Sequence, residues 1–168
     1  MLDAARLALT EPAGFLYLWG GPGNAKTEVL IAICNELRLR GLSVLYIKFA
    51  KLVEYMREAM TEKRQRHLGQ SDQRNYSDRF EQVLGLNVLA VDELDKARLT
   101  EFAQEFRFDF LDDRYRQGIN GLSLTLFGSN SDPATFPEPI WDRLRDGRFR
   151  IVHNKQASVR PFMARATN

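Results

Sequence analysis

The sequence predicts an α/β fold: a five-stranded, mainly parallel sheet flanked by helices on both faces. Short apolar runs alternate along the chain with segments of helical periodicity, as in parallel α/β proteins. The runs are apolar at consecutive positions, as expected of strands that are covered on both faces. The chain has 168 residues, 44% hydrophobic and 27% charged, and it contains no internal repeat or linker-like segment. We therefore expect one globular domain over residues 1–168.

The first predicted strand and helix flank a glycine-rich turn. Residues 15–19 form an apolar run between Gly14 and Gly20, which is typical of a buried strand. In residues 26–40 the apolar side chains recur at helical spacing, and the segment stops before Gly41, a common helix terminator. These features predict a strand–loop–helix unit near the start of the chain.

The middle of the chain predicts a second and a third strand. Residues 43–47 and 87–91 are apolar runs of strand length, and both strands are expected to be buried. Residues 49–60 carry an apolar stripe that is typical of an amphipathic helix. The polar stretch 61–79, rich in Arg and Gln, predicts a loop, and a short helix is expected near residues 79–84.

The last part of the chain predicts one long helix and two strands. Residues 99–115 place three phenylalanines four positions apart on one helical face. Residues 122–127 and the shorter run 149–153 complete the five strands. Three prolines between these two runs are expected to interrupt the connection.

The segment Gly20-Gly-Pro-Gly-Asn-Ala-Lys-Thr27 lies between the first predicted strand and helix. It matches the phosphate-binding pattern G-x-x-x-x-G-K-[ST] except at Ala25. Backbone N–H groups at such a helix start converge on a β-phosphate, and the Lys26 ammonium is expected between the β- and γ-phosphates. The Thr27 hydroxyl is expected to ligate Mg²⁺. The residues expected to contact ATP are Gly21, Pro22, Gly23, Asn24, Ala25, Lys26, Thr27 and Glu28.

Ala25 replaces the last glycine of this pattern. We expect it to be tolerated, because the residue before the lysine begins the helix and needs a helical rather than a positive φ. The alternative interpretation is a glycine-rich turn that binds no ligand. The strand–loop–helix context and the adjacent Lys26 and Thr27 favour phosphate binding.

Two polar strand ends are the next candidates. The third predicted strand ends in Asp92 and Glu93, and ligands of open α/β sheets bind at the carboxyl ends of strands. Asp92 is expected to hold Mg²⁺, and Glu93 to act as the general base that polarises the attacking water. Asn130 follows the fourth strand and is expected to orient that water or to contact the γ-phosphate. An ordinary Asx turn is the alternative for Asn130.

Residues 141–148 contain three arginines. An arginine presented to the γ-phosphate of a neighbouring subunit stabilises the charge of the transition state, a role that lysine fills less well. Arg143 is the first candidate for this role and Arg145 the second. A basic surface helix is the alternative interpretation.

The composition excludes several classes of protein. Lys and Arg number 24 against 22 Asp and Glu, and the resulting net charge of +2 indicates little about partners. The single cysteine, Cys34, cannot form an internal disulfide, and two separated histidines add too few ligands for structural zinc. No apolar run reaches the roughly 20 residues that cross a bilayer, and no secretory signal opens the chain. We expect a cytoplasmic protein without a membrane partner.

Together the motifs resemble those of the AAA+ ATPases of the DnaC/IstB group, which comprises bacterial helicase loaders and transposition helper ATPases. The resemblance covers nearly the whole chain. Its segments are residues 20–27, 50–57, 91–96, 128–130 and 140–145. The order and spacing of these segments are specific to this branch, whereas the phosphate-loop and acidic motifs alone are not.

The resemblance implies an AAA+ core that hydrolyses ATP with Mg²⁺. It implies that Asn130 is the sensor 1 residue, that Arg143 is an arginine finger acting in trans, and that Arg160 is a sensor 2 residue. ATP would then lie between subunits of a homo-oligomer. About fourteen residues precede the first predicted strand, so we expect little or no N-terminal partner-binding domain. The sequence ends at Asn168, so we also expect a minimal lid.

The implied partners belong to DNA replication. They are single-stranded DNA and a replicative helicase or another replication protein, with a transposase as the alternative. A solvated basic face explains the candidate DNA contacts equally well. These candidates are Lys51, Arg57, Lys63, Arg64 and Arg66.

Two other classes of function remain open from the residues. A small-molecule phosphotransferase shares the phosphate-loop motif, but such kinases seldom use an adjacent Asp92-Glu93 pair followed by a polar strand end. A nucleotide-gated binding module would hold ATP and hardly hydrolyse it, and the presence of Glu93 argues against this class.

Overall fold

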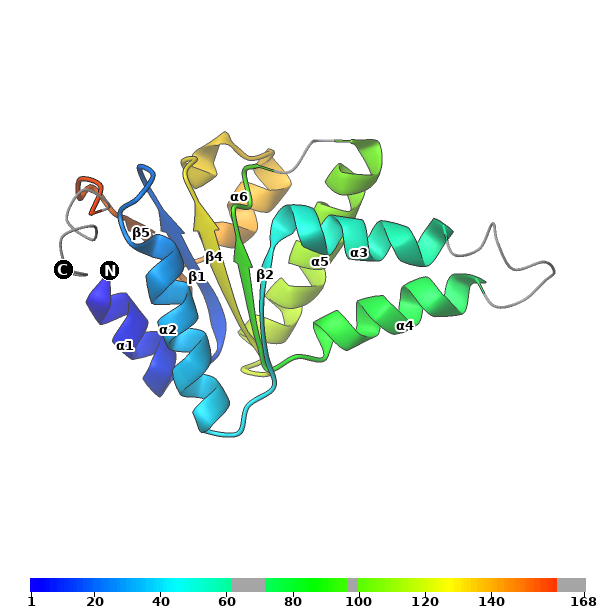
Figure 1. Ribbon diagram of the computed structural model, residues 1–168, viewed down its shortest axis with the longest axis horizontal. Helices are drawn as coiled ribbons and strands as arrows, with labels where there is room; N and C mark the ends of the chain where they lie inside the picture. Colours follow the sequence, from blue (N-terminus) through cyan, green and yellow to red (C-terminus); the bar gives the residue numbers. More distant parts are fainter. Residues whose placement is uncertain (62–71, 97–99, 160–168) are drawn as a thin grey trace, which may run out of the picture.

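The computed structural model describes residues 1–61, 72–96 and 100–159 (Figure 1). In this part of the chain five strands form one sheet in the order β2-β3-β4-β1-β5, and all neighbouring strands are parallel. The predicted α/β fold with a five-stranded sheet is confirmed. The strands are β1 (Gly14–Trp19), β2 (Val44–Lys48), β3 (Val88–Asp92), β4 (Leu124–Ser129) and β5 (Arg150–His153).

Helices cover both faces of this sheet (Figure 1). They are α1 (Leu2–Thr10), α2 (Lys26–Leu39), α3 (Phe49–Thr61), α4 (Asp72–Leu84), α5 (Glu101–Ile119) and α6 (Glu138–Leu144). α1 and α2 pack on one face, and α3, α5 and α6 pack on the other. α3 and α4 lie side by side and project beyond the β2 edge of the sheet. Within the described ranges, no helix is long and apolar enough to cross a membrane.

Alternation along β1 divides the core into two layers. Phe15 and Tyr17 pack on the side of α5, whereas Leu16 and Leu18 pack on the side of α2. All four side chains are buried. Because successive side chains of a strand point to opposite faces, a strand covered on both faces is apolar throughout, which is why this run predicts a strand.

The prediction that the second strand is buried is wrong. β2 is an edge strand, and among the described residues it pairs only with β3. Four of its residues are half-buried and the last, Lys48, is exposed. An apolar run of this length does not distinguish an edge strand from a central one, because helices cover part of both.

The prediction of a loop over residues 61–79 is wrong at its end. α4 begins at Asp72, and residues 62–71 lie outside the described part of the chain. Tyr76 and Phe80 of α4 stack with ring centroids 5.9 Å apart. Two aromatic residues at helical spacing are a weak pattern in a polar stretch, so the sequence predicts only the last turns of this helix.

One helix has no counterpart in the sequence prediction. α1 precedes the first strand, and its buried residues Ala5 and Ala8 pack against α2. Two small buried side chains give little periodic hydrophobic signal, because alanine is common on both buried and exposed helix faces. The packing against α2 therefore decides that this segment is a helix.

Arg114 of α5 is fully buried and links three elements. It donates to Thr125 Oγ1 (2.8 Å) and to the backbone oxygens of Leu84 (3.0 Å), Leu86 (2.7 Å) and Leu124 (2.7 Å). Burial lowers the pKa of its guanidinium to about 10. Arg114 therefore satisfies the carbonyl groups at the end of α4 and ties α5 to β4.

We expect Arg114→Met to lower the free energy of unfolding by about 3 kcal/mol, because buried carbonyl oxygens lose their donor. Urea unfolding measures the change. The matched control is Arg116→Met on the same helix, where the side chain is 68% exposed and the expected loss is below about 1 kcal/mol. Equal losses in the two variants would contradict the role of Arg114.

Candidate nucleotide-binding site

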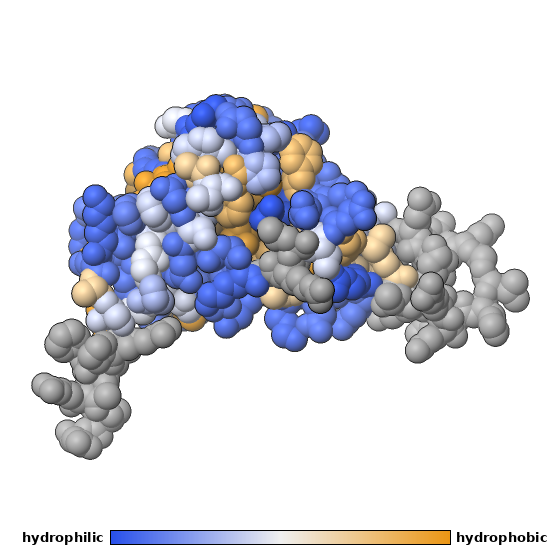
Figure 2. All heavy atoms as spheres, turned by 90° about the horizontal axis from the view of Figure 1, so that it is seen from above, coloured by the Kyte–Doolittle hydropathy of each residue, from blue (hydrophilic) through white to orange (hydrophobic). Residues whose placement is uncertain are grey.

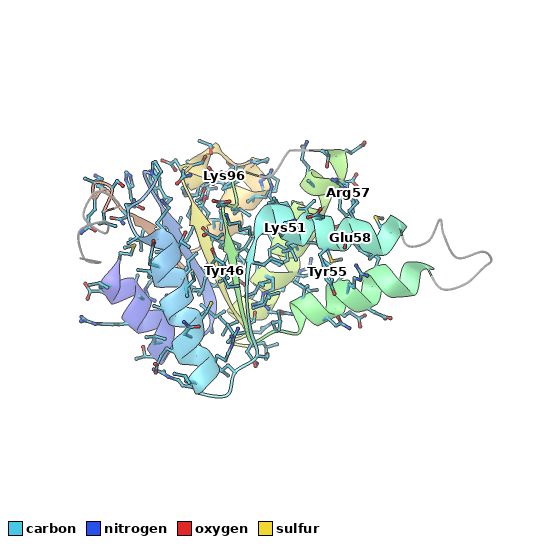
Figure 3. The ribbon with its side chains drawn as sticks, in the orientation of Figure 1. Tyr46, Lys51, Tyr55, Arg57, Glu58 and Lys96 are labelled. Atoms are coloured by element: carbon cyan, nitrogen blue, oxygen red, sulfur yellow. The ribbon has the colours of Figure 1, made fainter. Side chains whose placement is uncertain are left out.

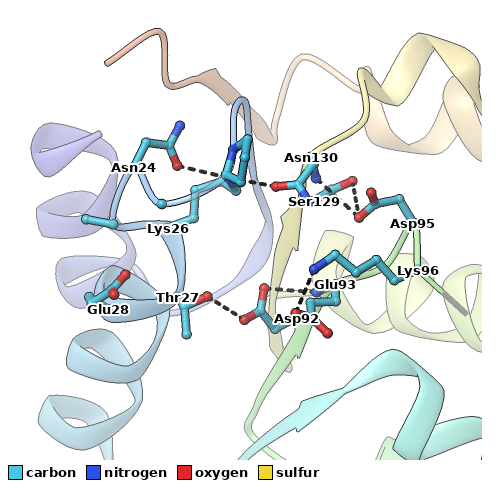
Figure 4. Close-up of a pocket in the computed structure, with 13 residues that line it drawn as sticks. Asn24, Lys26, Thr27, Glu28, Asp92, Glu93, Asp95, Lys96, Ser129 and Asn130 are labelled. Carbon is cyan, nitrogen blue, oxygen red and sulfur yellow. Dashed lines mark hydrogen bonds and ion pairs between the residues drawn. The ribbon is translucent and has the colours of Figure 1, made fainter. Parts of the chain in front are cut away.

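The turn between β1 and α2 forms one wall of a pocket at the carboxyl ends of the strands (Figure 4). The opposite wall comes from the residues that follow β3 and β4. The cavity volume of this pocket is about 70 Å³. Seen from above, the molecule is mostly hydrophilic, with hydrophobic residues between the polar ones (Figure 2). Residues 22–28 line the pocket together with Asp92, Glu93, Asp95, Lys96, Ser129 and Asn130.

Lys26 begins α2, and its buried ammonium group is held by four oxygen atoms. It lies 2.8 Å from the carbonyl oxygens of Gly20 and Gly21, 2.9 Å from Asn24 Oδ1 and 3.2 Å from Asn130 Oδ1. Burial lowers the pKa of Lys26. The fold thus brings together two candidate residues, Lys26 and Asn130, that lie 104 positions apart in the sequence.

Ala25 has a φ of 67°, so the prediction of a helical φ at this position is wrong. It is the N-cap of α2 rather than its first helical residue. A left-handed residue turns the chain from the loop into the helix, whose first N–H groups have no intrahelical partner. Side chains are disfavoured in this region, so Ala25 holds backbone strain that glycine would avoid.

Asp92 ends β3, and its carboxylate is held by three donors. Thr27 Oγ1 and Tyr46 Oη each lie 2.7 Å from Asp92 Oδ2, and the backbone nitrogen of Glu93 lies 2.9 Å from Oδ1. A hydroxyl and a carboxylate are the oxygen ligands that Mg²⁺ prefers. Thr27 and Asp92 therefore form a donor pair that fits the metal ion expected from the sequence.

Glu93 follows β3 with a φ of 54°, again in the left-handed region. Lys96 Nζ lies 2.9 Å from Glu93 Oε1, and Lys48 Nζ lies 3.2 Å from Oε2. The hydrogen bond from Lys96 lowers the pKa of Glu93, and Lys48 lowers it further. Both oxygens of this carboxylate therefore face cations at the pocket rim.

Residues 1–160 match the sequence profile of the IstB-like ATP binding proteins. The chain belongs to this IstB-like family. Among curated relatives, the replicative helicase loader DnaC of Escherichia coli strain K12 is 29% identical over 137 residues. That match covers 80% of this chain and 51% of DnaC, so the chain spans about half the length of this relative.

Solved structures share the fold of this IstB-like chain. The DnaC helicase loader superposes with a TM-score of 0.70 at 18% identity, over 92% of this chain and 88% of that one. The replication initiator DnaA bound to AMPPCP and single-stranded DNA gives 0.69 at 17% identity, over 92% and 45%. At such low identities the likeness shows the fold alone.

Gly128 of β4 leaves room for the carboxylate of Asp92. A Cβ atom at Gly128 would overlap Asp92 Oδ1 and lie 2.9 Å from Leu30 Cδ1. We expect Gly128→Ala to displace Asp92 and to weaken Mg²⁺-dependent binding of AMPPCP about tenfold, measured by calorimetric titration. The control is Gly147→Ala, where a Cβ meets nothing within 4 Å. Unchanged binding in Gly128→Ala would contradict this placement of Asp92.

Sequence reasoning missed Tyr46, because a tyrosine inside an apolar strand is usually a core residue. Burial raises the pKa of its phenol, and the hydrogen bond to Asp92 raises it further. The protonated Tyr46 hydroxyl therefore fixes the orientation of the carboxylate that also accepts from Thr27. Only the pairing of β2 with β3, which places the two strands side by side, indicates this role.

We expect Tyr46→Phe to raise the Mg²⁺ concentration at half-maximal ATP hydrolysis about fivefold, because one hydrogen bond to a charged group is lost. A Mg²⁺ titration at saturating ATP measures the change. The matched control is Tyr115→Phe, which removes a 2.9 Å hydrogen bond from a phenol to Asp146 away from the pocket. An equal Mg²⁺ requirement in Tyr46→Phe and wild type would show that Asp92 needs no such support.

Sequence reasoning also missed Asp95, which holds the strand end that carries Asn130. Ser129 Oγ (3.1 Å) and the backbone nitrogen of Asn130 (3.2 Å) donate to Asp95 Oδ1, and Ser131 Oγ (3.4 Å) donates to Oδ2. Asp95 therefore joins the segment after β3 to the segment after β4. Its only signal in the sequence is its position three residues after Asp92.

The structure places Arg143 and Arg145 in and beside α6, and neither lines the pocket of its own chain. Arg143 donates to the carboxylate of Asp112 and to the backbone oxygen of Pro139, and its guanidinium lies 5.1 Å from the ring centroid of Phe108. Arg145 pairs with acidic residues of α6 and is more exposed. If either arginine contacts a nucleotide, that nucleotide belongs to another copy.

The candidate DNA contacts on α3 are described only in part. Lys51 is exposed and pairs with Glu54 at 2.6 Å. Arg57 donates to Thr100 Oγ1 at 3.1 Å, and its guanidinium lies 5.6 Å from the ring centroid of Phe102. Figure 3 shows Lys51 and Arg57 on α3. Neither side chain lines the nucleotide pocket. The other DNA candidates, Lys63, Arg64 and Arg66, lie outside the described residues, and so does Arg160, the expected sensor 2 residue.

Proposed function

We propose that this chain is an ATPase that works in DNA replication as a helicase-loader-like factor, within a single AAA+ domain. One observation carries the proposal: a single pocket joins Lys26 to Asn130 and Thr27 to Asp92, with Glu93 at its rim. A loop cation, a hydroxyl–carboxylate pair and a further carboxylate match the groups that phosphoryl transfer to water requires. Membership of an ATP-binding family supports the choice of nucleotide.

Each residue has a role in the proposed reaction. The loop N–H groups and the Lys26 ammonium bind the phosphates, displacing the oxygen atoms that surround this ammonium in the free protein. Thr27 and Asp92 hold Mg²⁺, which neutralises phosphate charge when it is bound. Glu93 accepts a proton from the attacking water, and Asn130 orients that water beside the γ-phosphate.

We propose that a second copy completes this site. Arg143 does not line the pocket of its own chain, and its helix α6 packs against α5. In a homo-oligomer the same arginine can face the γ-phosphate bound to its neighbour and stabilise the charge of the transition state. Hydrolysis then depends on assembly.

The proposed binding partners of this chain are based on the names of its relatives. DnaC is a replicative helicase loader, and the DnaA structure contains single-stranded DNA. For this chain we propose a replicative helicase or another replication protein as the protein partner. We also propose that single-stranded DNA binds along α3 and that the protein works in the cytoplasm. The chain spans about half of DnaC, so the helicase contact needs its own binding test.

ATP hydrolysis measured against protein concentration, with and without single-stranded DNA, tests this function. We expect the specific activity to rise with concentration, to increase with DNA and to disappear in Lys26→Ala, because the loop loses its cation. No small-molecule acceptor should be needed. Activity that requires such an acceptor, or that survives Lys26→Ala, would refute the proposal.

A further inference from the structure

Two buried asparagines join the phosphate loop to the segment after β5. Asn24 Nδ2 donates to the backbone oxygen of Asn154 at 2.9 Å, and Asn154 Nδ2 donates to the backbone oxygen of Asn24 at 2.6 Å. The side chains are 1% and 5% exposed, although the residues lie 130 positions apart. Each amide therefore caps a backbone carbonyl of the other residue in a reciprocal pair, called here the amide pair.

The remaining polar atoms of the amide pair are also satisfied. Asn24 Oδ1 accepts from Lys26 Nζ at 2.9 Å, and Asn154 Oδ1 accepts from the backbone nitrogen of Gln156 at 3.2 Å. A Cβ atom at Gly20 would overlap the backbone oxygen of Asn154, so the two chain segments are in close contact. A fully satisfied buried polar network fixes one arrangement of the groups it joins.

The amide pair lies beside the strained residue of the loop. Ala25 follows Asn24 directly and has a φ of 67°, a conformation that non-glycine residues hold only when their surroundings impose it. A second tie, from the backbone nitrogen of Val159 to the oxygen of Gly23 at 2.8 Å, holds the loop on the same side.

We propose that Asn154, acting through Asn24, is a positioning residue that keeps the phosphate loop in its nucleotide-binding conformation despite Ala25. This inference rests on the proposed nucleotide site. Without the amide pair, Ala25 relaxes out of the left-handed region, and a nucleotide must restore that conformation when it binds. With glycine at position 25 the conformation is easy to restore, so the amide pair matters less.

The affinity for AMPPCP with Mg²⁺ in four proteins tests this coupling: wild type, Asn154→Ala, Ala25→Gly and the double variant. We expect Asn154→Ala to weaken binding about tenfold, the penalty of a left-handed alanine, and Ala25→Gly alone to change it less than about threefold. The double variant should return to within about threefold of wild type. The matched control is Asn120→Ala, which removes an exposed amide hydrogen bond to the backbone oxygen of Arg116 and should change nothing.

Wild-type affinity in Asn154→Ala would overturn the proposal, as would a double variant that binds no better than Asn154→Ala. If Asn154→Ala does not fold, Asn154→Asp keeps the side-chain volume and removes the donor to Asn24, and the same tenfold loss is expected. Hydrogen exchange of the loop amides without nucleotide gives a second readout. Exchange should accelerate in Asn154→Ala and not in Asn120→Ala; equal rates would overturn the proposal even if wild type failed to bind AMPPCP.

Discussion

Arg143→Ala is expected to reduce ATP hydrolysis by the assembled protein about 10³-fold while ATP binding changes less than about threefold. An arginine supplied in trans acts on the charge of the transition state and contributes 10³ to 10⁵ in rate in other nucleotide hydrolases. The effect on binding is small because Arg143 does not line the pocket of its own chain. Steady-state hydrolysis at high protein concentration, with separate ATP titrations, measures both quantities.

The fold should tolerate this change. Asp112, the partner of Arg143, also pairs with Arg116 at 2.7 Å, so its carboxylate keeps a cation in the variant. The matched control is Arg145→Ala, two residues away and 46% exposed, for which we expect less than a fivefold change in rate. A comparable loss of ATP hydrolysis in both variants would show that hydrolysis does not depend specifically on Arg143.

Mixing two inactive variants tests action in trans directly. Lys26→Ala lacks the loop cation but keeps Arg143, whereas Arg143→Ala has the opposite defect. In a mixed oligomer some sites combine an intact loop from one copy with an intact arginine from its neighbour, so activity should reappear on mixing. A mixture as inactive as its components would show that the two residues serve the same chain or that Arg143 has no catalytic role.

Glu93→Gln is expected to lower the rate of ATP hydrolysis about 10²- to 10⁴-fold and to leave a protein that retains bound ATP. Glutamine has nearly the same shape as glutamate, but it cannot accept the proton of the attacking water. Lys96 and Lys48 lower the pKa of Glu93, so the carboxylate is ionised at neutral pH, which is the form that can accept a proton. Single-turnover hydrolysis, followed by analysis of the bound nucleotide, measures rate and retention together.

Glu36→Gln is the matched control, because Glu36 pairs with Arg40 on the exposed side of α2. This variant should hydrolyse ATP at the wild-type rate. Hydrolysis by Glu93→Gln at that same rate would show that another group is the base. Loss of ATP binding in Glu93→Gln would instead indicate that this carboxylate supports the loop.

Local sequence determined the strands and the nucleotide loop of this protein. β1 and β4 are buried on both faces and mostly apolar, so runs such as 15–19 indicate strands without knowledge of their neighbours. Lys26 and Thr27 are candidates from the sequence alone, because the loop pattern lies within eight consecutive residues. Asp92 and Glu93 are candidates because they end an apolar run, and parallel sheets bind ligands where strands end.

Tertiary structure alone decided how distant residues support that loop. Tyr46 contacts Asp92 because β2 pairs with β3, and Asn154 reaches Asn24 because β5 pairs with β1. In the sequence these residues look like ordinary strand or turn positions. The left-handed backbone conformation of Ala25 is likewise imposed by the residues around it, because alanine alone prefers a helical φ. The strand ends come together only when the parallel strands pair in the folded chain. The supporting contacts therefore join residues of different segments and cannot be seen in any one segment of the sequence.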